Sequence, residues 1–528
     1  MIPSFLPWSI ASLVTGAVGL LSALYFGWTR YCKDLKERNL GDVLPSPPNA
    51  HWLLGHLSSL GGDFRIGQPR LTREYCNKYG QTALRLMSRK VVAVTSVEDA
   101  RAVLNGSNYR RPVPAFRVHM DKFLGPRNIG FLSGKEWKFH RSSIVRAFTP
   151  AALSEAQPEI LKVMSVVLAS LKEQKETQKS FQRDIGALMK MITIDIFGQT
   201  ALSRDLGCCS NLQPSSLAVA FDYLGEELSR RMFNPSSVAD YFYWIPTTRN
   251  RRHHRERKLL QDFLGELVRE RLAMPKENRP KDLLNGLLLG MEEGKDTIDS
   301  SHLSEDTVSD VLMSLLFAGY DTTSITLTYA LYHIATFPEV EKTCLAEIAQ
   351  ADVTNPDALP YCKGILLETL RLYPPAIFTS RTLEKPLTLS GGLTLPPDSY
   401  LLIPIWTIQR MEEHFEHPND FHPDRWAHQN ENGTWNERFE NDDAVAPIAG
   451  SGKDGISPAN RKAFLAFSGG ARSCAGTKFA MTEAVLILAQ LVKHFSFKLP
   501  ADYELFPERV GLVQRPRDNM IMTMKWRE

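Results

Sequence analysis

A long helical pattern between residues 304 and 338 constrains the fold of this chain more than any other feature. Ser304 is a good N-cap, Glu305 and Asp306 lie in the first turn, and apolar residues then recur with a period near 3.6 until Pro338. At about 1.5 Å per residue, a helix of this extent is roughly 50 Å long. We therefore expect one helix that crosses the whole body of the protein.

The middle of this expected helix contains polar residues within an apolar run, namely Gly319, Asp321, Thr322 and Thr323. A buried aspartate needs a partner or a path to solvent. In one interpretation, Asp321 faces a polar neighbour and the threonines hydrogen-bond to carbonyls four residues earlier, which bends the helix. In the other, the helix opens locally beside a cofactor, where a hydroxyl and a carboxylate move protons. The segment alone leaves both interpretations open.

The remainder of the chain predicts a single large body that is mainly helical. Beyond residue 50 the chain contains neither an internal repeat nor a linker rich in Gly, Ser or Pro, and 43% of the 528 residues are apolar, which is enough for a large core. Helical patterns dominate residues 150–350, and short β-type runs occur near residues 65–105 and 386–406. This combination predicts a mainly α, α+β fold with small β-sheets. The net charge of +3 is too small to indicate binding to nucleic acid.

An uncharged run near the amino terminus, residues 5–28, is long enough to cross the hydrocarbon core of a bilayer. Basic residues follow it directly, beginning with Arg30, and this positive charge should hold the carboxy-terminal side in the cytosol. In a cleaved signal peptide, by contrast, positive residues precede a shorter apolar run. We therefore expect a single-pass transmembrane anchor over residues 1–30, a basic and proline-rich linker over residues 31–50, and the folded body over residues 51–528.

Two charged residues, Glu368 and Arg371, lie three apart in a largely apolar helical run that ends before Pro374. On a helix surface such a pair stabilises the helix by only about 0.2–0.5 kcal/mol. In so apolar a helix, both charges are expected to be buried, and buried pairs need further partners. Arg425, in the segment FHPDRW, is the candidate for a third member of this cluster.

The segment FSGGARSCAG, residues 467–476, places Cys474 in glycine-rich backbone beside the fixed positive charge of Arg472. A structural turn, a reactive thiol and a metal ligand are all compatible with these residues. For a lone cysteine, a buried and inert thiol is the commonest outcome. The choice therefore depends on the other motifs in the chain.

Taken in order along the chain, these stretches resemble the cytochrome P450 family of haem-thiolate monooxygenases, and the resemblance covers roughly residues 45–526. The glycine-rich segment matches the family's haem-binding loop in full, at Phe467, Gly470, Arg472, Cys474 and Gly476. Residues 318–323 match its oxygen-activating motif.

Three further motifs extend the resemblance. Glu368 and Arg371 match the family's ExxR pair, and Arg425 lies in the loop that completes its triad. Trp137 and Arg141 match a WxxxR motif that holds a haem propionate, and Arg381 stands where the family usually has another propionate-binding arginine. Trp426 stands where phenylalanine is commoner, and the polar insert near residues 427–462 is longer than in many members.

The resemblance implies that Cys474 is the proximal thiolate ligand to the iron of haem b, a ligand type that favours cleavage of the O–O bond. It implies that Trp137, Arg141, Arg381 and Arg472 bind the haem propionates, that residues 51–528 form the haem-binding catalytic domain, and that backbone amides approach the sulfur. Asp321 and Thr322 are expected to deliver protons.

The resemblance also implies partners, a substrate class and a location. Electrons should come from NADPH through NADPH-cytochrome P450 reductase, with cytochrome b5 as an additional donor, and the catalytic domain should face the cytosol from the endoplasmic reticulum membrane. A lipophilic small molecule would be hydroxylated or epoxidised, in keeping with the aromatic residues Phe116, Phe123, Phe131, Phe317 and Phe378 in the expected substrate region.

Two alternatives remain at this point. One is a haem-thiolate rearrangement enzyme that uses peroxides without a reductase, although such relatives often lack the acid–threonine pair seen at Asp321 and Thr322. The other is a non-catalytic haem-binding protein, which has no need for proton delivery.

Overall fold

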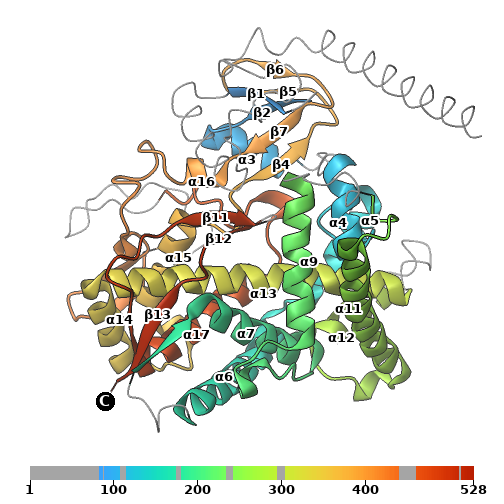
Figure 1. Ribbon diagram of the computed structural model, residues 1–528. Helices are drawn as coiled ribbons and strands as arrows, with labels where there is room; N and C mark the ends of the chain where they lie inside the picture. Colours follow the sequence, from blue (N-terminus) through green and yellow to red (C-terminus); the bar gives the residue numbers. More distant parts are fainter. Residues whose placement is uncertain are drawn as a thin grey trace, which may run out of the picture.

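The computed structural model describes residues 82–86, 89–106, 114–173, 180–233, 242–293, 304–438, 460–510 and 513–527. Within these ranges the chain forms a large helical body with small β-sheets, and the strands of the four-stranded sheet lie together at one end (Figure 1). The expected anchor, residues 1–30, and the linker, residues 31–50, lie outside the described residues. The predicted mainly α, α+β class of the body is confirmed.

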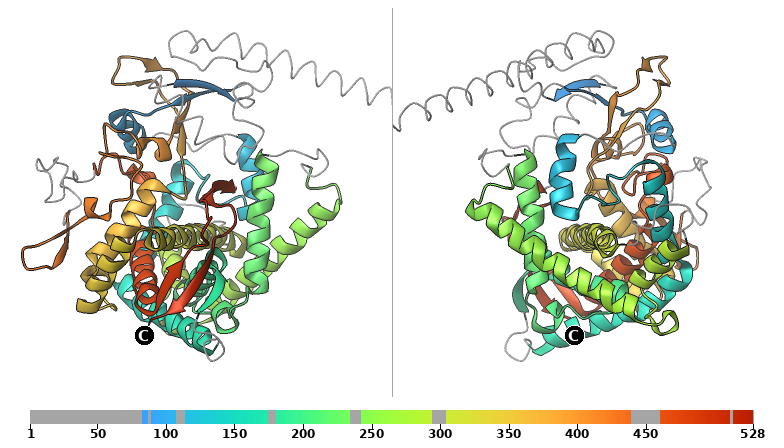
Figure 2. Two further views of the ribbon diagram at one scale, coloured as in Figure 1. Left: turned by 60° about the vertical axis from the view of Figure 1, so that its left-hand side comes forward. Right: turned by 90° about the vertical axis from the view of Figure 1, so that its right-hand side faces the viewer.

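The long central helix is α13, Glu305–Thr336, and its 32 residues correspond to about 48 Å. Ser304 caps it, because its side chain accepts a hydrogen bond from the Thr307 backbone N–H at 3.3 Å. Pro338 begins the next helix, α14, Pro338–Gln350, so both predicted ends of α13 are correct. Seen along its axis, α13 lies in the middle of the body (Figure 2).

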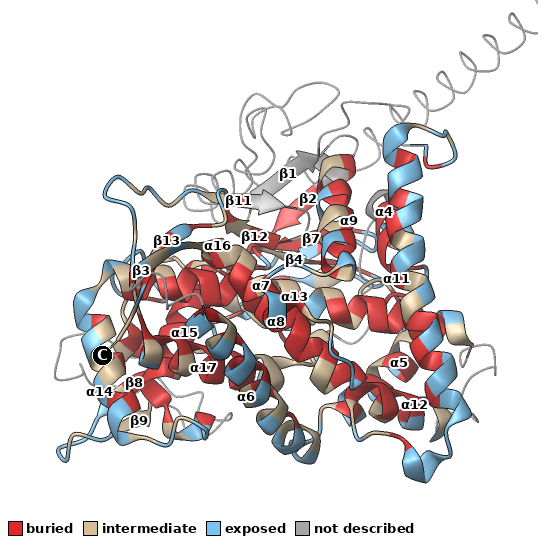
Figure 3. Ribbon diagram, turned by 60° about the horizontal axis from the view of Figure 1, so that its bottom comes forward, coloured by how far each residue is buried: buried red, intermediate tan, exposed pale blue. Residues whose placement is uncertain are grey.

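Four of the helices that pack against α13 make the most extensive contacts with it, and most of its surface is buried (Figure 3). They are α7, Ile185–Phe197; α11, Thr248–Ala273; α15, Pro360–Leu372; and α17, Thr477–His494. The other long helices are α3, Val97–Asn105; α4, Pro114–Leu124; α5, Gly134–Ala147; α6, Pro150–Glu173; α9, Ser216–Phe233; and α12, Leu283–Glu293. Because α7, α13 and α17 are apolar on most faces, they form the interior of one continuous core.

The β-structure consists of short strands. A four-stranded sheet has the order β1, Thr82–Leu86; β2, Arg89–Ala93; β7, Tyr400–Ile403; and β4, Thr379–Thr382, with β2 parallel to β7. A second sheet joins β10, Phe495–Lys498; β13, Ile521–Trp526; and β3, Ser180–Asp184. Three two-stranded pairs complete the described sheets: β5, Leu387–Thr388, with β6, Thr394–Leu395; β8, Ala427–Gln429, with β9, Trp435–Glu437; and β11, Pro507–Val510, with β12, Val513–Pro516.

A fully buried charge cluster joins α15 to the loop of residues 409–425. Arg371 donates two hydrogen bonds to the Glu368 carboxylate, at 2.8 and 2.7 Å, and Arg425 donates a third at 3.2 Å. The remaining Arg371 donors reach the backbone carbonyls of Gln409, Pro418 and Asp420. Burial alone would raise the pKa of Glu368, but the two guanidinium groups outweigh burial and lower it.

The tryptophan at position 426 also belongs to this cluster. Its indole N–H donates to Glu368 Oε2 at 2.9 Å. A phenylalanine at this position could not make that bond, because its ring has no donor. The tryptophan therefore adds a further donor to a buried carboxylate, which has lone pairs to satisfy.

One helical segment in the described part of the chain is long and apolar enough to cross a membrane. It spans Ile185–Leu202, with a mean hydropathy of 1.3, and 72% of it is buried inside the body. This segment is α7 with the turn that follows it, and it packs against α13. Its apolar character is explained by its place in the protein core.

Candidate active site

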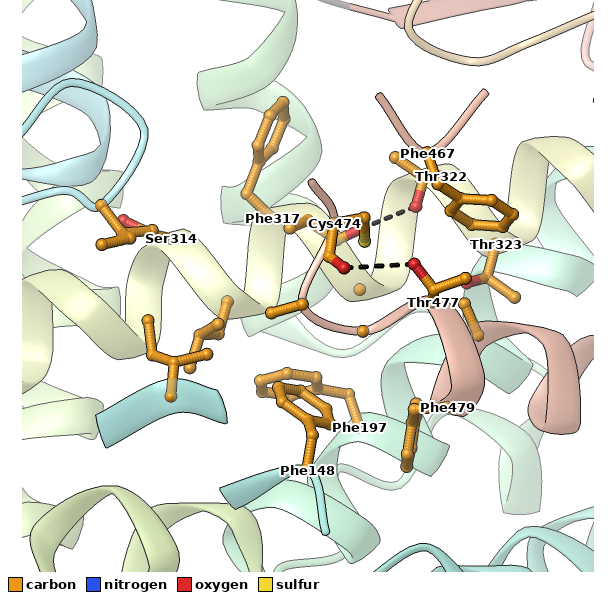
Figure 4. Close-up of a pocket in the computed structure, with 18 of the residues that line it drawn as sticks. Phe148, Phe197, Ser314, Phe317, Thr322, Thr323, Phe467, Cys474, Thr477 and Phe479 are labelled. Carbon is orange, nitrogen blue, oxygen red and sulfur yellow. Dashed lines mark hydrogen bonds between the residues drawn. The ribbon is translucent and has the colours of Figure 1, made fainter. Parts of the chain in front are cut away.

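A cavity of about 1070 Å³ lies between α13 and the segment that contains Cys474. Its wall is mostly apolar and includes Phe148, Phe197 and Phe479, which gather at one end (Figure 4). Of the phenylalanines expected to contact substrate, Phe131, Phe317 and Phe378 line the cavity. Phe123 instead packs behind the wall, with its ring centroid 5.4 Å from that of Phe317. The side chain of Phe116 lies outside the described residues.

Cys474 is exposed to this cavity and lies in a short connection that leads into α17. Its backbone N–H donates to the Phe467 carbonyl at 2.9 Å, and its own carbonyl accepts from Thr477 Oγ1 at 3.1 Å (Figure 4). These bonds close the loop onto itself and present the thiol to the cavity. Phe467 and Gly476 line the cavity as well.

The loop is braced from behind by α3. Gly470 has a φ of +66°, and a Cβ added there would lie 2.1 Å from the Leu104 carbonyl oxygen. Arg101, also on α3, donates to the carbonyls of Arg461 and Lys462 at 3.1 and 2.9 Å. The close backbone approach that glycine permits is therefore an approach to α3. Among the described residues, no hydrogen bond reaches the Cys474 sulfur.

We predict that Gly470→Ala prevents formation of an intact site. The new Cβ would overlap backbone atoms that cannot move aside, and a left-handed conformation costs a non-glycine residue about 1–2 kcal/mol by itself. The haem content per chain and the thermal unfolding midpoint measure the effect. Gly134→Ala is the matched control, because Gly134 has a φ of +63° with nothing within 4 Å of an added Cβ. Equal effects of both changes would show that the contact with α3 is unimportant.

Three of the predicted anion-binding residues lie together on the cavity wall. Trp137 and Arg141 project from α5, and the Arg472 guanidinium lies 4.2 Å from the centre of the Trp137 ring. Arg472 also donates to the Leu132 carbonyl at 2.9 Å. Burial lowers the pKa of Arg141, and the electrostatic interaction with Cys474 acts in the opposite direction. This wall thus carries positive charge next to the thiol.

Arg381 is placed differently. It is 1% exposed, and its guanidinium donates to Thr379 Oγ1 at 3.1 Å and to the Ser380 carbonyl at 2.9 Å. Thr379 and Ser380 border the cavity, whereas Arg381 is absent from the described lining residues. The structure therefore brings Arg381 to the edge of the site, one residue behind its wall.

Thr322 and Asp321 are neighbours on α13 but face different spaces. Thr322 lines the large cavity, and its hydroxyl donates to the Ala318 carbonyl at 2.7 Å. Asp321 instead lines a small second pocket on the other side of the helix. The helix is continuous through this region, and the threonine bonds back to the carbonyl four residues earlier. Both details agree with the interpretation in which Asp321 faces polar neighbours and the threonine hydrogen-bonds to the carbonyl four residues earlier.

The second pocket is strongly charged. Lys190 Nζ lies 2.7 Å from Asp222 Oδ1 and 4.0 Å from Asp321 Oδ1, and Arg515 donates to Glu226 at 2.9 Å. Burial raises the pKa of Asp321, and Asp222 adds to this rise, while Lys190 opposes it. Asp321 therefore retains a proton at higher pH than an ordinary aspartate does.

One titratable residue that lines the cavity was not predicted to belong to the site. Glu483, on α17, lines the large cavity, is 2% exposed, and forms no ion pair among the described residues. Burial raises the pKa of Glu483 well above the usual value. The sequence signal that could have identified this residue is a single glutamate within the apolar run AMTEAVLIL.

Comparison with known proteins agrees with this arrangement. The family model described as cytochrome P450 matches residues 45–522. The chain is similar to cytochrome P450 4F12 of Homo sapiens, with 24% identity over 93% of this chain and 90% of that protein. It is 26% identical to cytochrome P450 monooxygenase 128 of Postia placenta, over 90% of this chain and 89% of that protein. It is 27% identical to cytochrome P450 3A2 of Rattus norvegicus, over 73% and 75% of the two chains.

The family model extends over the central helix, the buried Glu368–Arg371 pair and the Cys474 loop alike. Since the match covers most of the chain and includes every described element that borders the cavity, this protein belongs to the cytochrome P450 family of haem-thiolate monooxygenases.

Proposed function

We propose that this protein is a membrane-anchored monooxygenase that hydroxylates or epoxidises a lipophilic small molecule with electrons from NADPH. The observation that carries the proposal is a single apolar cavity bordered by the Cys474 thiol and by the Thr322 hydroxyl. A rearrangement enzyme or a haem-binding protein would use the thiol but has no need of the acid–threonine pair.

The residues of the cavity suit a haem. Its volume of about 1070 Å³ exceeds what one small ligand usually requires, about 300–1,000 Å³, and so leaves room for a cofactor and a substrate. Cys474 would bind the iron, and Trp137, Arg141 and Arg472 would hold the propionates, with Arg381 contributing from the edge. When bound, haem supplies the iron centre at which dioxygen is activated.

The protein side chains provide the proton path and the substrate surface. Thr322 can turn its hydroxyl from the Ala318 carbonyl into the cavity, where it can donate a proton or hold a water molecule. Asp321, whose pKa is raised by burial, would take up protons on the side of the second pocket. Phe131, Phe317 and Phe378 exclude water and favour an apolar substrate.

The membrane anchor and the electron donor rest on the sequence. The uncharged run of residues 5–28 and the basic residues behind it support a single-pass anchor in the endoplasmic reticulum membrane, with residues 51–528 in the cytosol. Such a location would place the catalytic domain beside a membrane-bound NADPH-cytochrome P450 reductase, with cytochrome b5 as a second donor.

The deciding experiment compares two oxidant supplies for the full-length, haem-loaded protein. One reaction contains NADPH, the reductase and a library of lipids and terpenoids, and the other contains peroxide alone. We expect NADPH consumption to rise with a substrate that also shifts the haem spin state, with one oxygen atom found in the product. Turnover with peroxide only would support the rearrangement enzyme, and haem binding without either activity would support the binding protein.

We predict that Thr322→Ala separates NADPH use from product formation. Without the hydroxyl, proton delivery in the cavity fails, and electrons are diverted to hydrogen peroxide. Loss of a positioned proton donor typically costs about 10²–10⁴-fold in rate, so product per NADPH should fall by about tenfold or more while haem content is retained.

Thr336→Ala is the matched control for this change. Thr336 lies on the same helix and also bonds back, to the Tyr332 carbonyl at 2.8 Å, but it is exposed and remote from the cavity lining. Peroxide and product are both quantified against NADPH. Unchanged coupling in Thr322→Ala would contradict the role of this hydroxyl.

A further inference from the structure

The turn between α4 and α5, residues 125–132, forms one wall of the cavity. Asn128, Ile129, Gly130 and Phe131 all line it, and Asn128 is 0% exposed. Since this turn is neither helix nor strand, its shape must be set by contacts other than a regular hydrogen-bond ladder.

The start of the turn is held by Asp310, on α13. Gly125 has a φ of +94°, and a Cβ added to it would lie 1.8 Å from Asp310 Oδ1. The backbone N–H of Arg127 donates to Asp310 Oδ2 at 3.1 Å. The carboxylate therefore rests directly on the glycine and fixes the next residues of the turn.

The interior of the turn is held by the side chain of Asn128. Its amide donates to the Gly125 carbonyl at 2.7 Å and to Asp121 Oδ1 at 3.2 Å. The Phe131 N–H in turn donates to the Asn128 carbonyl at 3.2 Å. Movement of Gly125 or Arg127 would therefore be passed on to the residues that face the cavity.

The end of the turn is held by the cysteine loop. Arg472 donates to the Leu132 carbonyl at 2.9 Å, and Leu132 is 3% exposed. The turn is thus fixed at one end to α13 and at the other to the loop that presents Cys474. These are the two sides of the cavity.

The surroundings of Asp310 indicate that its carboxylate serves this turn. It is 6% exposed, and the charges of Arg257 and Arg127 act on it without forming an ion pair among the described residues. A buried carboxylate without a paired charge is unfavourable unless hydrogen bonds compensate it. The hydrogen bond that this carboxylate accepts from the turn comes from the Arg127 N–H. Burial raises the pKa of Asp310 to about 6, and the Arg127 N–H opposes this rise.

We propose that Asp310 is a positioning residue that fixes the cavity wall formed by residues 128–131 and thereby determines how well bulky ligands bind. This inference rests on the proposed haem-containing site, but it does not depend on turnover. It predicts that loss of the Asp310 acceptor lowers the affinity for ligands that contact the wall. The affinity for ligands that bind only to the iron should not change.

The test uses two azoles that coordinate haem iron, imidazole and the bulkier 4-phenylimidazole, titrated into the full-length, haem-loaded protein. In Asp310→Ala, the dissociation constant of 4-phenylimidazole should rise about tenfold, which corresponds to about 1.4 kcal/mol. That of imidazole should stay within about twofold of the wild type. Asp310→Asn, which keeps an oxygen acceptor, should restore most of the affinity. Asp306→Ala, an exposed acid on the same helix, is the control.

Hydrogen exchange supplies a readout that does not need a ligand. The amides of Arg127 and Phe131 should exchange faster in Asp310→Ala than in the wild type, and near the wild-type rate in Asp310→Asn. If Asp310→Ala fails to bind haem, Asp310→Leu preserves the bulk of the side chain and removes the acceptor.

Unchanged exchange, or an equal loss of affinity for both azoles, would overturn the proposal. Azole binding needs haem but no catalysis. A protein that shows the azole effect without NADPH-driven turnover would therefore refute the monooxygenase function and leave this inference standing.

Discussion

Cys474→Ala is expected to abolish the red-shifted Soret band of the reduced carbonyl complex. That band depends on a thiolate that donates electron density to the iron, and Cys474 is the one cysteine among the described lining residues of the cavity. The other described cysteines are buried and are not among the described lining residues of this cavity. Absorption spectra of the reduced protein, with and without carbon monoxide, measure the effect.

Ser473→Ala is the control, because it changes the neighbouring residue of the same loop and keeps the thiol. It should retain the red-shifted band. Persistence of the band in Cys474→Ala would refute the assignment of Cys474 as the ligand. Loss of the band in both variants would indicate damage to the loop and would require Cys474→Ser to separate folding from ligation.

The second large effect is expected from Glu368→Ala. This change leaves Arg371 and Arg425, which are 0% and 1% exposed, without their carboxylate partner. Breaking a buried pair by removing one partner costs about 3–5 kcal/mol, a large share of the stability of a typical domain. We expect the yield of haem-loaded protein to collapse and the urea midpoint of any remaining protein to fall sharply.

Lys258→Ala is the control for Glu368→Ala. Lys258 and Asp262 form an exposed pair at 2.9 Å, and exposed pairs of this kind contribute about 0.3–0.5 kcal/mol. The folded-state pKa of Glu368 is lowered, so its contribution is present above the unfolded pKa and is lost as the pH falls through the folded one. Equal unfolding midpoints for the two variants would show that the cluster does not stabilise the body.

Much of this architecture was predictable from local signals. The ends of α13 follow from Ser304 and Pro338, which act within one helical turn of their own positions. The meeting of Glu368, Arg371 and Arg425 was expected because charges in an apolar helix must find partners. The cysteine loop was identifiable because its glycines, arginine and thiol have a fixed spacing.

Other features depend on contacts between distant parts of the chain and left no local signal. Helical spacing shows that Asp321 and Thr322 point in different directions, about 100° apart, but it does not reveal what each faces. The placement of Asp310 on Gly125 requires the packing of α4 against α13, and the parallel pairing of β2 with β7 joins residues about 300 apart. The sequence contains each of these residues, but only the folded chain shows their partners.

The contacts of the cysteine loop have a consequence for how the protein is made. Arg472 donates to the carbonyl of Leu132, 340 residues earlier in the chain, and Arg101 donates to the carbonyl of Arg461, 360 residues later. At about 5–20 residues per second, a ribosome needs roughly 20 to 70 seconds to synthesise the chain between the first pair. During that interval α3, α4 and α5 exist without the segment that completes their shared wall. The wall that these helices share with the cysteine loop can therefore be completed only after the ribosome has synthesised the chain past residue 472.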